Sequence, residues 1–207
     1  MGKMMESTCT DFAAALAAKE SVPGGGGAAA YVGALGAALC SMVGNFTTGK
    51  KKYADVEEDV QRMLAQAEEV RVRLLELVDE DAEAFFPLSQ AYGIPKEDPT
   101  RAERLEATTK DAIAAPLEML RQIAKCIELL EEMGEKGSRM LISDVGCGAL
   151  LASAAIQAAS MNVFINTKSL TDRDFAQKVE TEADSLLATF VPRAEAVAAQ
   201  VASGIRG

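Results

Sequence analysis

Residues Pro23-Gly24-Gly25-Gly26-Gly27 lead directly into the alanine- and glycine-rich run Ala28 to Gly44, inside an uncharged segment that extends from Ser21 to Gly49. A second segment, Val145 to Thr167, is also free of charge. Both are long enough to cross a membrane, but they consist mainly of Gly, Ala, Ser and Asn, which gain little free energy on entering lipid. The two segments therefore predict buried central helices in a protein that has no membrane association.

The remaining chain indicates helix almost throughout, because no segment alternates polar and apolar residues as a strand does. We predict an all-α fold, an up-and-down helical bundle that forms a single domain over residues 1–207. The expected helices cover about 10–19, 24–45, 54–92, 99–132, 143–167 and 172–202. Pro116 should kink the fourth helix or break it in two, because proline lacks a backbone donor and clashes with the preceding turn.

The composition limits the classes of partner. With 21 basic and 31 acidic residues, the net charge of −10 argues against nucleic acid and favours a soluble protein with local cationic sites. The chain contains no histidine, and its four cysteines lie far apart, so neither a metal site nor a disulfide framework is expected. The N-terminus lacks an apolar signal core, so we expect a cytoplasmic protein.

Two features of the first uncharged segment indicate a small-molecule site. Four consecutive glycines, Gly24, Gly25, Gly26 and Gly27, favour a backbone that a ligand or another chain approaches closely. Lys50 and Lys52 follow the helix and are candidates for anion binding; the alternative is a solvated helix end whose cations complement the helix dipole. The segment 44–51 resembles a phosphate-binding loop, but Lys51 replaces the required Ser or Thr and a helix precedes it.

Asp81 is the candidate acid or base. It interrupts a line of apolar residues at heptad-like spacing on the third helix: Ala67, Leu74, Val78, Phe85, Leu88 and Tyr92. A carboxylate on an apolar face is costly unless it is paired or functional, and burial moves its pKa toward the range useful for proton transfer. The alternative is a structural partner for Asp81, such as a buried arginine or a helix terminus.

Polar residues at the two ends of the second uncharged helix are further candidates. Ser143 and Asp144 stand at its start, where capping alone would explain both residue types. Alternatively, Asp144 presents two acceptor oxygens to the planar amidine edge of a ligand. Asn162 and Asn166 lie one turn apart and either bind a ligand or cross-link helices.

Small residues recur every four positions in the first uncharged helix, at Ala29, Gly33, Ala37 and Ser41. Such a ridge lets another helix come very close. Because the two uncharged helices present more of this surface than a monomer of this size covers, we predict a homodimer with these helices near its two-fold axis.

The combined motifs resemble the cyclodeaminase/cyclohydrolase family, which includes the C-terminal domain of formiminotransferase-cyclodeaminase and stand-alone methenyltetrahydrofolate cyclohydrolases. The resemblance spans nearly the whole chain, in the family's order. It rests on these segments: 23–27, Gly49-Lys50-Lys51-Lys52-Tyr53, 79–85, Pro116, Ser143-Asp144-Val145-Gly146 and 162–166. Gly27 departs from the pattern, because the family often has serine there.

The resemblance implies a helical, dimeric enzyme that acts on a one-carbon tetrahydrofolate without a metal or redox cofactor. It implies that Lys50 and Lys52 bind the anionic glutamate tail and that Asp144 binds the pterin. It also implies that the glycines line the pterin slot and that a carboxylate transfers the proton, for which Asp81 is the first candidate and Asp144 the next. We favour a methenyltetrahydrofolate cyclohydrolase; the alternatives are a formimidoyltetrahydrofolate cyclodeaminase and a non-catalytic folate-binding helical dimer.

Overall fold

The computed structural model describes residues 3–207, and within them every regular element is helical. The long helices are α2 (Gly25–Asn45), α3 (Glu57–Tyr92), α4 (Arg101–Lys136), α5 (Ile142–Thr167) and α6 (Arg173–Arg206). The shorter elements are η1 (Met4–Glu6), α1 (Cys9–Ala17), η2 (Lys51–Val56) and η3 (Arg139–Leu141). The predicted all-α fold is confirmed.

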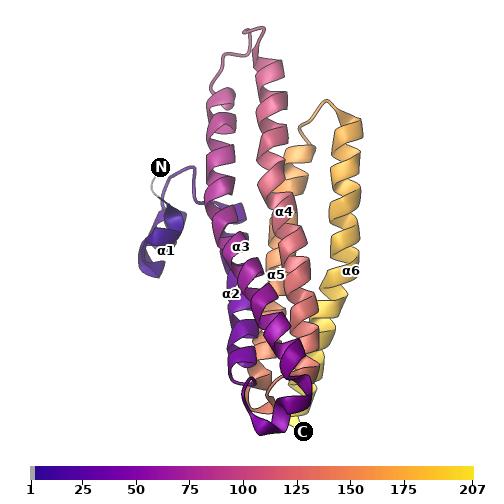
Figure 1. The fold of residues 1–207 in the computed structure, drawn as a ribbon. Helices are drawn as coiled ribbons and strands as arrows, with labels where there is room; N and C mark the ends of the chain where they lie inside the picture. Colours follow the sequence, from indigo (N-terminus) through magenta and orange to yellow (C-terminus); the bar gives the residue numbers. More distant parts are fainter. Residues whose placement is uncertain (1–2) are drawn as a thin grey trace.

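The five long helices run up and down in one bundle (Figure 1). In this view α3 and α4 lie in front of α2 and α5, while α6 stands at the side. Helix α2 packs against α3, α4 and α5, and α5 packs against α4 and α6. The tip of the α3–α4 hairpin extends beyond the other helices, and α1 projects from the side of the bundle.

Side-chain caps, and a glycine followed by a proline, fix several helix ends near the predicted positions. Thr8 caps α1, since its Oγ1 accepts from the backbone N–H of Asp11 at 3.1 Å. Asp172 caps α6 in the same way, accepting from the N–H of Phe175 at 3.0 Å. Helix α3 ends at Tyr92 with Gly93 as its C-cap, two residues before Pro95, which matches the predicted end at residue 92.

Of the two outcomes predicted at Pro116, a kink or a break, the break is wrong, because α4 continues through it over 36 residues. Pro116 is buried among neighbouring helices, and that packing offsets the lost backbone hydrogen bond. The prediction that Tyr92 belongs to the apolar, inward-facing line of this helix is also wrong. Tyr92 lies in the last turn of α3, and its side chain is 53% exposed.

The small-residue ridge of α2 packs within its own chain. A Cβ added at Gly33 would lie 2.9 Å from the Cγ1 atom of Ile123 on α4, and one added at Gly36 would lie 3.2 Å from the carbonyl oxygen of Gly148 on α5. The predicted close approach is therefore real, but it joins helices of one bundle. The dimer expectation has to rest on other residues of these helices.

Helices α2 and α5 both have the length and apolar composition of a membrane span, yet about half of each is buried inside the bundle. A core helix of a water-soluble protein satisfies the same criteria. Their buried halves supply part of the hydrophobic core.

Candidate functional site

The glycine tract forms the N-terminus of α2, where Asp81 of α3 approaches it. Gly24 is the N-cap, and no side chain of its own segment caps the helix. A Cβ added at Gly26 would lie 2.5 Å from Oδ2 and 2.6 Å from Oδ1 of Asp81. Only glycine at position 26 therefore leaves room for this carboxylate beside the start of the helix.

Asp81 is half-buried, and burial raises the pKa of its carboxyl group to about 6. The backbone N–H of Gly27, in the first turn of α2, acts in the opposite direction and stabilises the ionised form. Among residues 3–207, no cation forms an ion pair with Asp81 under 4 Å. Of the structural partners considered for Asp81, the helix terminus is present and the buried arginine is not.

Asn162 of α5 lies on the other side of the glycine tract. A Cβ at Gly25 would be 3.7 Å from both the Nδ2 and the Oδ1 atom of Asn162. The Asn162 side chain donates from Nδ2 to the carbonyl oxygen of Ala158 at 3.0 Å, so its own helix orients it and Oδ1 keeps its acceptor capacity. Asn166 follows one turn later and is half-buried. The structure thus brings three helices together here.

The predicted lysines follow the C-terminal end of α2. Gly49 has a φ of +71°, which only glycine adopts readily, and its N–H donates to Oε2 of Glu57 at 3.0 Å. This turn directs the chain into the lysine segment. The Nζ of Lys50 lies 5.9 Å from the ring centre of Phe46, and the Nζ of Lys52 lies 5.4 Å from that of Tyr53.

Both lysines are exposed, and neither pairs with a carboxylate in the described part of the chain. Their charge is therefore available to an anion.

Ser143 and Asp144 lie in the first turn of α5, near the same end of the bundle. Helix α5 begins at Ile142 with Leu141 as its N-cap, and no side chain caps it. The interpretation of Ser143 as a cap is therefore wrong: it is one residue inside the helix and exposed. Asp144 is half-buried in the first turn, where a negative charge complements the helix dipole.

The sequence did not predict the role of Tyr53, which links the lysine segment to the start of α5. Its hydroxyl oxygen accepts from the backbone N–H of Arg139 at 3.2 Å, just before Ile142. This bond lowers the pKa of Tyr53 more than any other contact. The position of Tyr53 directly after three lysines was the available signal.

The predicted site residues therefore form two groups. The glycine end consists of Gly24, Gly25, Gly26, Gly27, Asp81, Asn162 and Asn166. The lysine end consists of Lys50, Lys52, Ser143 and Asp144. Helix α2 has 21 residues, so the two ends lie about 30 Å apart within one chain. Asp81 and Asp144 consequently do not meet in one monomer.

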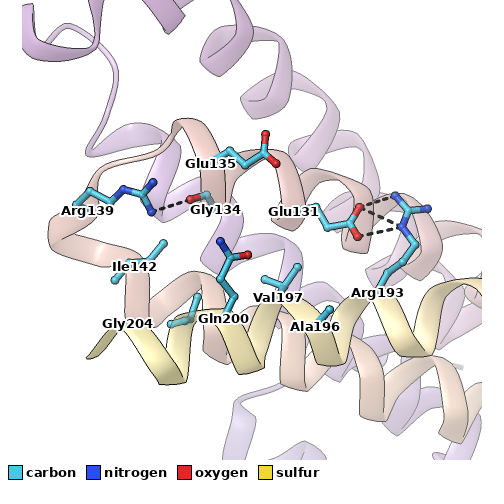
Figure 2. A pocket seen from close by; sticks show the side chains of 11 residues that line it. Glu131, Gly134, Glu135, Arg139, Ile142, Arg193, Ala196, Val197, Gln200 and Gly204 are labelled. Atoms are coloured by element: carbon cyan, nitrogen blue, oxygen red, sulfur yellow. Dashed lines mark hydrogen bonds and ion pairs between the residues drawn. The ribbon is translucent and has the colours of Figure 1, made fainter. Parts of the chain in front are cut away.

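A separate cavity of about 730 Å³ lies between the end of α4, the start of α5 and α6, and Figure 2 shows its lining. Its lining contains no predicted site residue. Its two arginines are already engaged: Arg193 pairs with Glu131 at 2.5 Å, and Nη1 of Arg139 donates to the carbonyl oxygen of Gly134 at 3.1 Å. We therefore place the candidate site at the two groups described above.

Comparison with known proteins identifies the family of the chain. Residues 8–185 match the family model described as formiminotransferase-cyclodeaminase. The chain is 43% identical over 185 residues to a methenyltetrahydrofolate cyclohydrolase of Methylorubrum extorquens, covering 87% of this chain and 89% of that protein.

It is also 31% identical over 188 residues to the formimidoyltransferase-cyclodeaminase of Mus musculus, covering 89% of this chain but 35% of that longer protein.

The solved structures give the same result. The crystal structure of formiminotetrahydrofolate cyclodeaminase from Thermotoga maritima superimposes with a TM-score of 0.84 and 30% sequence identity. The match covers 96% of this chain and 98% of that one, so the two bundles share their whole architecture. The resemblance read from the sequence motifs is confirmed, and the chain belongs to the formiminotransferase-cyclodeaminase family.

Proposed function

We propose that this chain is a methenyltetrahydrofolate cyclohydrolase, which hydrolyses 5,10-methenyltetrahydrofolate to 10-formyltetrahydrofolate. The observation that carries the proposal is the carboxylate of Asp81, which lies against Gly26 in a partly buried setting and lacks a cationic partner within residues 3–207. The 43% identity to a cyclohydrolase of similar length supports this reaction over others of the family.

In this mechanism the bridging methenyl carbon, a cation between two nitrogens, is attacked by water. Asp81 accepts the proton of the attacking water as the carbon–oxygen bond forms. The tetrahedral intermediate then collapses to a formyl group on N10, the bond from carbon to N5 breaks, and N5 recovers a proton. One proton is released overall. A base with a pKa of about 6 is ionised at neutral pH and suited to this step.

Formimidoyltetrahydrofolate cyclodeaminase activity is the second candidate, supported by the mouse and Thermotoga relatives. There N5 and N10 bridge the formimino carbon and ammonia leaves, which requires a general acid. A carboxyl group with a pKa near 6 can also supply that proton. A folate-binding dimer without turnover is the third candidate.

The other predicted residues would bind the substrate. Lys50 and Lys52 offer exposed positive charge to the glutamate tail, and Asp144 offers acceptor oxygens to the pterin amidine edge. The glycine tract gives a flat ligand close access to the backbone, and Asn162 adds an amide oxygen beside it.

The proposed enzyme is a homodimer in the cytoplasm and requires no metal or redox cofactor. The substrate carbon is already electrophilic, and the chain has no histidine to serve as a ligand. Wild-type enzyme treated with a chelator should therefore keep full activity.

The decisive experiment follows loss of methenyltetrahydrofolate absorbance beside ammonia release from formimidoyltetrahydrofolate, with buffer-only rates subtracted. We expect turnover of the methenyl substrate, and a fall of about a hundredfold or more in kcat for Asp81→Asn with folate binding retained. The wild-type profile of kcat/KM should rise with pH through about 6, because Asp81 must be ionised to act as base.

Near-normal turnover in a folded Asp81→Asn protein would remove Asp81 as the catalytic group. Ammonia release without methenyl turnover would assign the cyclodeaminase reaction, and tight folate binding with neither reaction would assign the binding protein.

A further inference from the structure

The cavity of about 730 Å³ at the end of α4 lies apart from the residues proposed to bind folate. Its walls are the last turns of α4, the start of α5 and the C-terminal half of α6 (Figure 2). Small-molecule sites typically have volumes of about 300 to 1,000 Å³. The α6 wall lies beyond residue 185, where the match to the family model ends, so that match leaves this cavity unassigned.

One side of the cavity, formed by α5 and α6, is apolar. Ile142, Val197 and Val201 supply its hydrocarbon surface. Helix α6 packs closely on α5 here, since a Cβ added at Gly146 would lie 2.8 Å from Cγ1 of Val201. At the end of α6 the space is open, because a Cβ added at Gly204 would meet no atom within 4 Å. This side therefore offers a firm surface to the hydrocarbon part of a ligand.

At one end of the cavity the charges are already paired. Arg193 donates from Nη2 to Oε2 of Glu131 at 2.5 Å and from Nε to Oε1 at 3.0 Å, and its Nη1 lies 3.5 Å from Oε1 of Glu128. The guanidinium carbon also lies 4.7 Å from the ring centre of Phe190. These contacts join α6 to α4, so Arg193 forms a wall of the cavity and is not available to a ligand.

At the other end, charges remain available. Nη1 of Arg139 donates to the carbonyl oxygen of Gly134 at 3.1 Å, which orients the guanidinium group (Figure 2). The Nε and Nη2 atoms of Arg139 have no acceptor among residues 3–207. Glu135 lines the same cavity and forms no ion pair under 4 Å in this part of the chain. Gln200 extends its carboxamide group from α6 toward Gly134.

Arg139 and Glu135 stand four positions apart, but they do not share a helix. Helix α4 ends one residue after Glu135, Gly137 has an extended backbone with ψ of 172°, and Arg139 begins η3. On a continuous helix this spacing would let the two side chains form an ion pair. The turn between them prevents that pairing and leaves two opposite charges facing one cavity.

Backbone hydrogen bonds hold this turn in place. The N–H of Ser138 donates to Oγ1 of Thr47 at 2.8 Å, in a buried position, and the N–H of Arg139 donates to the hydroxyl oxygen of Tyr53 at 3.2 Å. Arg139 is therefore presented from a fixed backbone. A preorganised group of this kind loses less conformational entropy when a ligand binds.

A ligand that satisfies both charges carries a carboxylate and an ammonium group. A carboxylate accepts two parallel N–H bonds from the Nε–Nη2 edge of a guanidinium group, and this edge is the available one in Arg139. An ammonium group complements the carboxylate of Glu135. A simple anion would be repelled by Glu135 and a simple cation by Arg139, so the pair favours a zwitterion over either.

We propose that this cavity binds a free α-amino acid with an apolar side chain. Arg139 binds its carboxylate, Glu135 and Gln200 bind its ammonium group, and its side chain packs against Ile142 and Val197. The proposal does not rest on the cyclohydrolase assignment, because none of the residues proposed to bind folate lines this cavity.

Isothermal titration calorimetry with L-phenylalanine and L-leucine, in the absence of folate, tests the proposal. The full chain should bind about one molecule of either amino acid. N-acetyl-L-phenylalanine lacks the ammonium group and phenethylamine lacks the carboxylate, so each should bind about tenfold or more weakly than L-phenylalanine. Glycine, which keeps both charges but has no side chain, should also bind about tenfold or more weakly.

Variants of the charged residues assign the two contacts. Arg139→Gln keeps the backbone N–H that donates to Tyr53, and Glu135→Gln keeps the size of the side chain. Each should weaken binding of L-phenylalanine about tenfold or more. The matched control is Glu195→Gln, which removes the same charge from an exposed position of α6 outside the cavity and should leave affinity unchanged.

A pair of steric variants locates the ligand. Ala196 is exposed and lines the cavity, so Ala196→Leu should fill part of it and abolish binding while the melting temperature is kept. Ala199 is exposed on the same helix but does not line the cavity, so Ala199→Leu should bind as the wild type does.

The proposal is wrong if the wild type binds neither amino acid at concentrations up to about 10 mM. Equal affinity for N-acetyl-L-phenylalanine would show a plain anion site, and binding that survives Ala196→Leu would place the ligand elsewhere; both results overturn the proposal. None of these results bears on folate turnover. A wild type without turnover would in turn refute the proposed function and leave the calorimetric result intact.

Discussion

The burial and the raised pKa of Asp81 depend on the glycine that faces it, Gly26. Gly26 leaves the carboxylate room at the N-terminus of α2, and burial then penalises its charge without a cation to compensate in the described chain. The amide of Gly27 limits this penalty but does not cancel it. The result is a carboxyl group that titrates near neutrality, which is useful for proton transfer and costly for stability.

This cost gives a prediction for Asp81→Asn. Below about pH 4 the carboxyl is protonated in both the folded and the unfolded state, so the wild type pays no charge penalty. As pH rises through the folded pKa of about 6, the wild type loses up to about 3 kcal/mol of stability. The Asp81→Asn variant keeps this stability, because its side chain does not ionise. The variant should therefore be the more stable protein at pH 7 to 8 and equal near pH 4.

Urea unfolding at fixed protein concentration across this pH range measures the difference. A less stable Asp81→Asn protein at pH 7 would reveal a buried cation that Asp81 neutralises, and with it a structural role.

At the scale of the helices, α2 and α5 each have two different surfaces. Composition predicted that they are central, since uncharged Gly- and Ala-rich runs belong in a core. It could not show which stripe faces inward, because residues such as Gly33 and Leu35 lie close in sequence yet on opposite sides. The ridge of small residues was therefore assigned to a dimer, while the structure uses it inside the bundle.

Pro116 illustrates the same limit. Its local effect on a helix is known, but the packing that holds α4 continuous around a buried proline is a tertiary property. Asp81, in contrast, was predicted because a carboxylate within an apolar line is itself an anomaly of the sequence. Its actual neighbour, Gly26, is 55 residues away in the chain, and only the fold brings the two together.

The inner surface of α2 can be tested with one methyl group. Gly33→Ala places a Cβ 2.9 Å from Ile123, in the centre of the core, and should destabilise the fold by about 1 to 3 kcal/mol. Gly204→Ala on α6 meets nothing within 4 Å and should be neutral or slightly stabilising, by about 0.5 kcal/mol.

Thermal unfolding of the two variants at equal concentration gives the comparison. Equal melting temperatures would mean that α2 and α4 separate easily, contrary to the packing described here.

On the scale of the whole molecule, the net charge of −10 opposes the binding of an anionic ligand. It therefore repels an anionic folate, whereas Lys50 and Lys52, just after the C-terminal end of α2, are exposed and have no carboxylate partner within residues 3–207. These two lysines therefore offer local positive charge to an anionic ligand on a chain whose net charge is negative.

The last prediction separates this local patch from the general charge of the molecule. Lys50→Ala and Lys52→Ala should each raise KM about three- to tenfold with little change in kcat, and more for a polyglutamylated substrate. The increase should shrink as salt rises from about 20 mM to about 500 mM, because screening weakens the lost attraction. Lys96→Ala, at the tip of the α3–α4 hairpin, removes the same charge far from the site and should leave KM unchanged. If all three variants shift KM equally, net charge rather than a tail-binding site governs affinity; if none does, the lysines are a solvated helix end.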